Sequence, residues 1–135
     1  MARILVIDDE ELARFTLREI LEGAGHEVTE ARNGNEGLSF QRAQHFDLVI
    51  TDIIMPEKEG VETIIEIKRD FPDLPVIGIS GGGRTRNLDF LKLAKDYGAD
   101  QILPKPFSES QLLDMVKEVL HARLHAAMRG ETSGD

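Results

Sequence analysis

The stretch Leu48-Val49-Ile50-Thr51-Asp52-Ile53-Ile54-Met55-Pro56 decides the fold, because it sets one carboxylate at the end of a continuous apolar run. Such a short run, bounded by residues that break a strand, is typical of a strand buried on both faces of a parallel sheet. A carboxylate at the mouth of that strand is costly unless another group compensates its charge. Taken alone, Asp52 is equally compatible with the start of a turn, where Asp is common.

The composition predicts one soluble globular domain. The 135 residues are enough for a proper core, and 41% hydrophobic with 30% charged residues is ordinary for such a domain. The 16 Lys and Arg against 25 Asp and Glu give a net charge of −9, which disfavours direct binding to nucleic acid or an anionic membrane surface. The absence of cysteine excludes disulfides and thiol catalysis, and no apolar run has membrane-spanning length, so a cytoplasmic location is expected.

Five apolar runs alternate with five helical patterns along the chain. The expected strands cover residues 4–7, 27–29, 47–51, 75–79 and 99–103. A helical pattern follows each strand. The first has apolar residues at roughly helical spacing, namely Leu12, Phe15, Ile20 and Leu21. The second covers residues 36–44 after a turn at 33–35, and the fourth begins at Thr85 or Asn87. This alternation predicts an α/β domain over residues 1–128, with its parallel sheet covered on both faces and a polar tail at 129–135. Ser108 is expected to cap the last helix.

Polar side chains follow the expected strands at their carboxyl ends. Asp8 and Asp9 follow the first strand, Asp52 the third, Ser80 the fourth and Lys105 the fifth. Ligands of open parallel sheets bind at this edge. Carboxylates gathered there cannot all remain ionised without a cation, and hard oxygen ligands with no Cys or His favour Mg²⁺. A carboxylate nucleophile, a metal, an amine and a hydroxyl are the parts that phosphoryl transfer needs.

The motifs Asp8-Asp9, Asp52 with Met55-Pro56 and Gly60, Ser80-Gly81 and Lys105-Pro106-Phe107 carry a resemblance to a known family. Together they resemble the receiver domain of two-component response regulators, over about residues 2–121. The resemblance implies a flavodoxin-like, doubly wound (βα)5 fold whose five-stranded parallel sheet has the strand order 2-1-3-4-5.

The resemblance also implies a role for each matched residue. Asp52 would accept a phosphoryl group from a phosphohistidine, while Asp9, Asp52 and the backbone carbonyl of Ile54 would bind Mg²⁺ directly and Asp8 would do so through water. Lys105 would bind a phosphoryl oxygen. The peptide bond between Lys105 and Pro106 would be cis. Ser80 would be the hydroxyl that moves toward the phosphoryl group.

The sequence departs from the family pattern at two positions. Ile102 stands where the family usually has an aromatic residue that reports activation, so output is expected to depend on backbone shifts around the glycine loop Gly81-Gly82-Gly83 and to change the surface of residues 80–102. Ile54 stands where a polar side chain often orients water, so a longer-lived phosphoryl group is expected.

The expected partners are a histidine kinase or phosphotransfer protein, and a downstream protein or an output domain outside this chain. The chain would catalyse only its own phosphorylation and dephosphorylation. Two alternatives stay open: a degenerate receiver that acts as a constitutive interaction module, and a Mg²⁺-dependent phosphohydrolase, which would need a second carboxylate where Ile54 stands. His121 and His125 have the spacing of a metal pair, but with no third ligand nearby they are interpreted as helix-terminal histidines.

Overall fold

The computed structural model describes residues 1–53, 60–80 and 95–128, without the side chains of residues 80 and 126–128. In chain order the elements are β1 (Arg3–Ile7), α1 (Glu11–Gly23), β2 (Glu27–Ala31), α2 (Gly34–Ala43), β3 (Leu48–Asp52), α3 (Gly60–Asp70), β4 (Val76–Ser80), β5 (Gln101–Pro104) and α5 (Glu109–Met128). No helix in these ranges is both long enough and apolar enough to cross a membrane.

The five strands form one sheet in the order β2-β1-β3-β4-β5, with every neighbouring pair parallel. This is the strand order that the family resemblance implied, and β2 lies at an edge as expected. Ile7 of β1 pairs with Thr51 of β3, so the next residues along the chain, Asp8 and Asp52, reach the same edge of the sheet. The alignment of strand ends positions the site described below.

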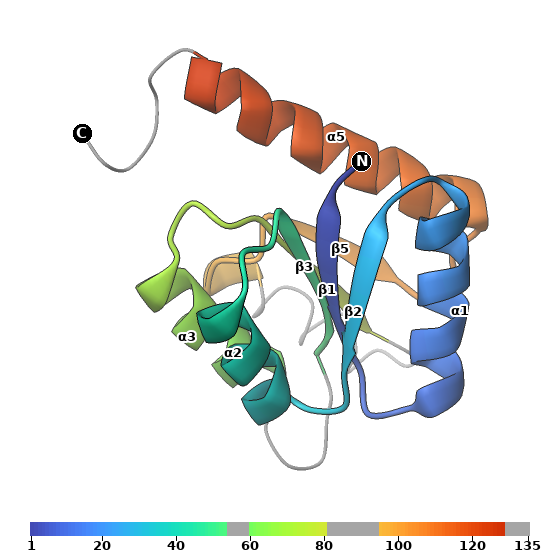
Figure 1. Ribbon diagram of the computed structural model, residues 1–135, viewed down its shortest axis with the longest axis horizontal. Coiled ribbons are helices and arrows are strands. Elements are labelled where there is room, and N and C mark those ends of the chain that lie inside the picture. The colour runs from blue at the N-terminus through green and yellow to red at the C-terminus, as the bar shows by residue number, and fades with distance from the viewer. Residues whose placement is uncertain (54–59, 81–94, 129–135) are drawn as a thin grey trace.

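Helices cover both faces of the sheet, which confirms the doubly wound architecture. Figure 1 shows α1 and α5 on one side of the strands and α2 and α3 on the other. In β1, Ile4 and Val6 belong to the core cluster on the α1 and α5 side, whereas Leu5 and Ile7 belong to the cluster on the other side. All four are fully buried, as a strand between two helical layers requires.

The buried side of α1 differs from the expectation. Leu12 and Phe15 were expected on the apolar stripe, but they are 76% and 53% exposed. The buried residues are Arg14, Leu17 and Leu21, spaced three and four apart as one face of a helix requires. Leu17 and Leu21 pack into the core and set the rotation of the helix, which turns an arginine inward and two apolar residues outward.

Two helices begin with side-chain caps that fix their first turns. The α2 helix begins at Gly34, before the predicted start at residue 36, because Asn33 Oδ1 accepts the N–H of Glu36 at 2.8 Å. At α5 the predicted cap is confirmed: Ser108 Oγ accepts the N–H of Gln111 at 3.0 Å, and Gln111 Oε1 accepts the N–H of Ser108 at 2.7 Å. This reciprocal pair is a capping box.

Several predictions fall beyond the part of the chain that the structure describes. They are the glycine loop at 81–83, most of the fourth helix with its cap at Thr85 or Asn87, and the tail at 129–135. The last strand is described, and it covers residues 101–104, later than the predicted 99–103. The register with β4 begins at Gln101, which pairs with Ile77, and the N–H of Asp100 just before it donates to the carbonyl oxygen of Val76 at 2.8 Å, so Ala99 precedes the pairing.

Candidate metal and phospho-acceptor site

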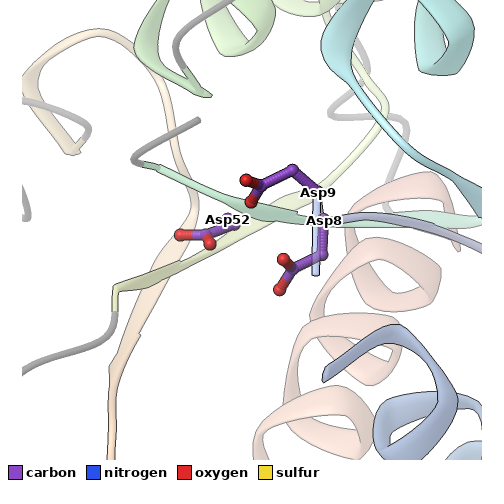
Figure 2. Close-up of side chains that lie close together, drawn as sticks. All are labelled: Asp8, Asp9 and Asp52. Carbon is purple, nitrogen blue, oxygen red and sulfur yellow. The ribbon is translucent and has the colours of Figure 1, made fainter. Parts of the chain in front are cut away.

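Three carboxylates meet at the carboxyl ends of β1 and β3. One carboxylate oxygen from each of Asp8, Asp9 and Asp52 lies within 4.8 Å of those from the other two. Figure 2 shows the three side chains extending from the strand ends toward the same side. Asp8 and Asp52 are buried, with 1% and 7% of their surface exposed, whereas Asp9 is exposed. The sequence predicted this shared edge, and the structure brings the three residues together.

Asp52 owes its position to the centre of the sheet. It is the last residue of β3, which lies between β1 and β4, and it pairs with Ile79 of β4. Every residue of β3 is buried, so its backbone is held by neighbours on both sides and by core packing on both faces. Asp52 therefore projects from a strand that has neighbours at both edges and packing on both faces.

The polar atoms of Asp8 are engaged on every side. Its N–H donates to the carbonyl oxygen of Ala31 at 3.1 Å, and its carbonyl oxygen accepts from Arg14 Nη1 at 2.8 Å. Its carboxylate Oδ1 accepts the N–H of Glu10 at 2.9 Å, and its Oδ2 lies 3.9 Å from Lys105 Nζ. Backbone and side chain of Asp8 are thus both fixed by hydrogen bonds and one ion pair.

Burial raises the pKa of Asp8 above its ordinary value. The Glu10 N–H and the Lys105 ammonium lower that pKa, and the negative charge of Asp9 raises it, but loss of hydration has the largest effect. The ionised form is therefore disfavoured, and a nearby cation would relieve the penalty. A cluster of carboxylate oxygens is the kind of donor set that Mg²⁺ and Ca²⁺ prefer, so the residues present fit a hard divalent ion.

A glycine closes the loop that follows Asp52. The N–H of Gly60 donates to the carbonyl oxygen of Ile53 at 2.8 Å, which returns the chain to the strand end. A Cβ atom on Gly60 would overlap the carbonyl oxygen of Asp52 and the Cα atom of Ile53. Only glycine allows the start of α3 to approach the backbone of Asp52 so closely.

Lys105 follows β5 at the same edge, with 26% of its side chain exposed, and the Lys105–Pro106 peptide bond is cis as predicted. The predicted ligand carbonyl of Ile54 and the predicted hydroxyl of Ser80 lie outside the described residues and side chains. Sequence reasoning missed Arg14, which donates to Asp8 from inside α1. A signal was present, because Arg14 continues the three-and-four spacing of Leu17 and Leu21.

The histidine pair on α5 adds no ligand set in the described ranges. The rings of His121 and His125 lie side by side with centroids 4.9 Å apart. Within those ranges, the aspartates at the strand ends are the one group of three or more side chains that could hold a metal ion. Both histidines are exposed, and His125 lies in the last turn of α5, as expected for a helix-terminal histidine.

The fold and the site together define a flavodoxin-like α/β protein with an acidic, lysine-bearing site at the carboxyl edge of its sheet. The family model of the response regulator receiver domain matches residues 4–117, and the chain belongs to this family of two-component signalling proteins. Phosphorylation-dependent switching is the general function of that family.

Relatives and solved structures agree with this assignment. The chain is 35% identical to the chemotaxis protein CheY of Halobacterium salinarum over 120 residues, which are 89% of this chain and 98% of that protein. The structure of a CheY-like receiver domain protein from Methanospirillum hungatei superposes with a TM-score of 0.84 at 30% identity, covering 93% of this chain and 98% of that one.

Longer proteins match over one part of their length. The structure of NtrX from Brucella abortus gives a TM-score of 0.90 at 30% identity and covers 96% of this chain but 29% of that one. The chain also covers 53% of the length of the response regulator MprA of Mycolicibacterium vanbaalenii. The chain therefore spans nearly all of some relatives and about half or less of others.

Proposed function

We propose that this chain is a phosphorylation switch in which Asp52 accepts a phosphoryl group from the phosphohistidine of a histidine kinase or phosphotransfer protein. Asp9, Asp52 and the carbonyl of Ile54 would hold Mg²⁺ directly, with Asp8 acting through water. Residues 1–128 would form the receiver domain. The observation that carries the proposal is the convergence of Asp52 with Asp8 and Asp9, within 4.8 Å, at the edge where Lys105 also reaches Asp8.

The transfer needs little from the protein beyond positioning and charge compensation. A carboxylate oxygen of Asp52 forms the new bond to phosphorus while the bond from phosphorus to the histidine nitrogen breaks, and its electron pair returns to the imidazole. A bound Mg²⁺ supplies positive charge that neutralises the phosphoryl oxygens. Lys105 supplies a second positive charge from β5, and burial of Asp52 excludes much of the competing water.

Output is proposed to pass through the surface formed by residues 80–102. Ile102, which stands at the usual aromatic position, is partly buried and packs against the core cluster shared with α2 and α3. A branched side chain packed in this way is poorly suited to swing between two positions, which supports output through backbone shifts. The partner would be a downstream protein or an output domain outside this chain.

The two alternatives are less well supported. A degenerate receiver would need no acceptor set, yet the acidic group and Lys105 are both in place. A phosphohydrolase would need a second carboxylate, acting as general acid and base, two residues after Asp52, and Ile54, which stands there, has no ionisable group.

Phosphorylation by a small donor tests the proposal directly. With Mg²⁺ and acetyl phosphate, the intact mass of the chain should increase by one phosphate, and excess EDTA should prevent the increase. Asp52→Asn should abolish labelling, whereas Asp114→Asn, at an exposed position of α5, should label as the unaltered chain does. Labelling of Asp52→Asn to the same extent would show that the acceptor lies elsewhere.

A further inference from the structure

Arg14 contacts the turn at residues 8–10, here called the acidic turn, which carries two of the proposed metal ligands. It belongs to α1, and only 9% of its surface is exposed. Its Nη1 donates to the carbonyl oxygen of Asp8 at 2.8 Å in a buried hydrogen bond. A buried arginine is uncommon unless its charge is paired, so its partners indicate what it does there.

The charge of Arg14 is paired by Glu30 of β2. Arg14 Nε donates to Glu30 Oε1 at 3.2 Å, and the second oxygen of Glu30 accepts from Arg18 Nη1 at 2.9 Å. The Arg18 side chain is 44% exposed and pairs with Glu22 and Glu30, whereas Arg14 joins Glu30 to the acidic turn. The planar guanidinium suits this task because its donors have fixed directions.

Several hydrogen bonds hold the turn at residues 8–10. The N–H of Asp8 donates to Ala31, the N–H of Glu10 donates to the carboxylate of Asp8, and the N–H of Arg14 donates to the carbonyl of Glu10. Arg14 Nη1 holds the carbonyl of Asp8 and therefore the peptide plane between Asp8 and Asp9. Rotation of that plane would move both carboxylates relative to Asp52.

We propose that Arg14 is a positioning residue of the metal site: it fixes the Asp8–Asp9 peptide so that both carboxylates face a divalent cation, and Glu30 orients Arg14. This inference rests on the proposed function, because it concerns the affinity of the same acidic site. It assigns to α1 and β2 a part in metal binding, although neither Arg14 nor Glu30 contributes a ligand.

The sign of the effect separates positioning from simple electrostatics. A positive guanidinium close to carboxylates opposes the binding of a second cation, so its removal should tighten Mg²⁺ binding if charge alone mattered. Loss of positioning should instead weaken Mg²⁺ binding. A purely structural role would lower the melting temperature and leave the Mg²⁺ dissociation constant unchanged at temperatures where the variant is folded.

The test is a Mg²⁺ titration of the full chain by calorimetry, for the unaltered chain and for Arg14→Met, Arg14→Lys and Arg18→Met. We expect both Arg14 variants to bind Mg²⁺ about tenfold more weakly, the lower end of the effect of removing supporting groups around metal ligands. Arg14→Lys keeps the charge but lacks the fork that reaches both Glu30 and Asp8. Arg18→Met, which also removes a partner of Glu30, should leave the dissociation constant unchanged.

A second measurement needs no metal. Hydrogen exchange of the Glu10 amide, which donates to the Asp8 carboxylate, should accelerate in Arg14→Met and stay unchanged in Arg18→Met. If Arg14→Met proves unfolded, Glu30→Gln provides the test, with weaker Mg²⁺ binding and faster Glu10 exchange expected in the same direction.

The outcomes are distinguishable. Unchanged or tighter Mg²⁺ binding in the folded Arg14 variants, or in folded Glu30→Gln where that variant is the test, would overturn the inference and leave the proposed function standing. Absence of saturable Mg²⁺ binding by the unaltered chain would overturn the proposed metal site, and this inference with it.

Discussion

The ammonium of Lys105 lies 3.9 Å from the carboxylate of Asp8, so the lysine that follows β5 contacts the most deeply buried member of the acidic group. This contact lowers the pKa of Asp8, but burial raises the same pKa by more. An ionised Asp8 is therefore an unfavourable element of the fold unless a cation binds beside it.

Asp8→Asn is expected to stabilise the fold at pH 7 in the absence of divalent metal. A raised pKa in the folded state means that the stability contributed by Asp8 is fully present below its unfolded pKa and is lost as pH rises through the folded value. Asparagine keeps an oxygen for the Glu10 N–H but carries no charge. Thermal unfolding should show a higher melting temperature, with roughly 4 °C for each kcal/mol gained.

The control for that experiment is Asp114→Asn, the same change at an exposed position of α5. It should alter the melting temperature little at any pH. The gain from Asp8→Asn should shrink below about pH 4, where unfolded aspartates become protonated. A less stable Asp8→Asn variant at pH 7 without metal would contradict the role assigned to burial.

Gly60→Ala is expected to destabilise the chain and to disturb the site together. The new methyl group would overlap the backbone of Asp52 and Ile53, neither of which can move without distorting β3. Overpacking of this kind costs about 1–3 kcal/mol. Denaturant unfolding and Mg²⁺ titration should therefore both report a loss.

Gly23→Ala is the matched control, because a Cβ atom there would have nothing within 4 Å. In the last turn of α1 the substitution should be neutral or stabilising by up to about 1 kcal/mol. Equal losses from the two substitutions would show that close approach to Asp52 is not what requires glycine at position 60.

The edge of the sheet could be predicted from the sequence because its residues follow apolar runs directly. Asp8 comes after Ile4 to Ile7, and Asp52 ends the run at 48–51. Parallel strands bring such ends to one edge whatever the details of packing. The strand order came from the family motifs, since alternation of strands and helices does not specify which strands are neighbours.

Arg14 and the steric need for Gly60 could not be found in the same way. A search for apolar periodicity passes over a buried arginine. It also assigned Leu12 and Phe15 to the buried face of α1, although both side chains are exposed. The meaning of Arg14 depends on Glu30 and on the carbonyl of Asp8, which the fold brings beside it. The spacing of Arg14 with Leu17 and Leu21 indicates only that Arg14 faces inward, whereas its contacts join separate elements of the chain and cannot be read from that spacing.

Mg²⁺ should stabilise the folded chain, with Asp9 contributing more to its affinity than Asp8. Asp8 already accepts the Glu10 N–H and faces Lys105, whereas Asp9 is exposed at the edge of the site. By mass action, a concentration of 100 times the dissociation constant adds about 2.7 kcal/mol. Melting temperatures measured against Mg²⁺ concentration should show a larger loss of response for Asp9→Asn than for Asp8→Asn. A melting temperature indifferent to millimolar Mg²⁺ would argue against the site.

The last prediction concerns how Lys105 links the site to the proposed output surface at residues 80–102. A phosphoryl group on Asp52 presents more negative charge than Asp8 does, so we expect the ammonium to leave Asp8 and contact the phosphoryl oxygens. This movement of the Lys105 side chain should shift the backbone of β5 and of residues 80–102. With Mg²⁺ and beryllofluoride, a phosphoryl mimic, backbone amide shifts of the unaltered chain should change near Asp52, in residues 81–86 and in residues 101–107.

Lys105→Met should retain the changes near Asp52 and lose most of those at residues 101–107, because the mimic can still bind the carboxylate but no longer attracts β5. Lys117→Met, which removes an exposed lysine from α5, should behave as the unaltered chain does. If Lys105→Met gives the full pattern, the lysine does not transmit the signal. If the unaltered chain responds only around Asp52, the chain stores phosphate without switching its surface.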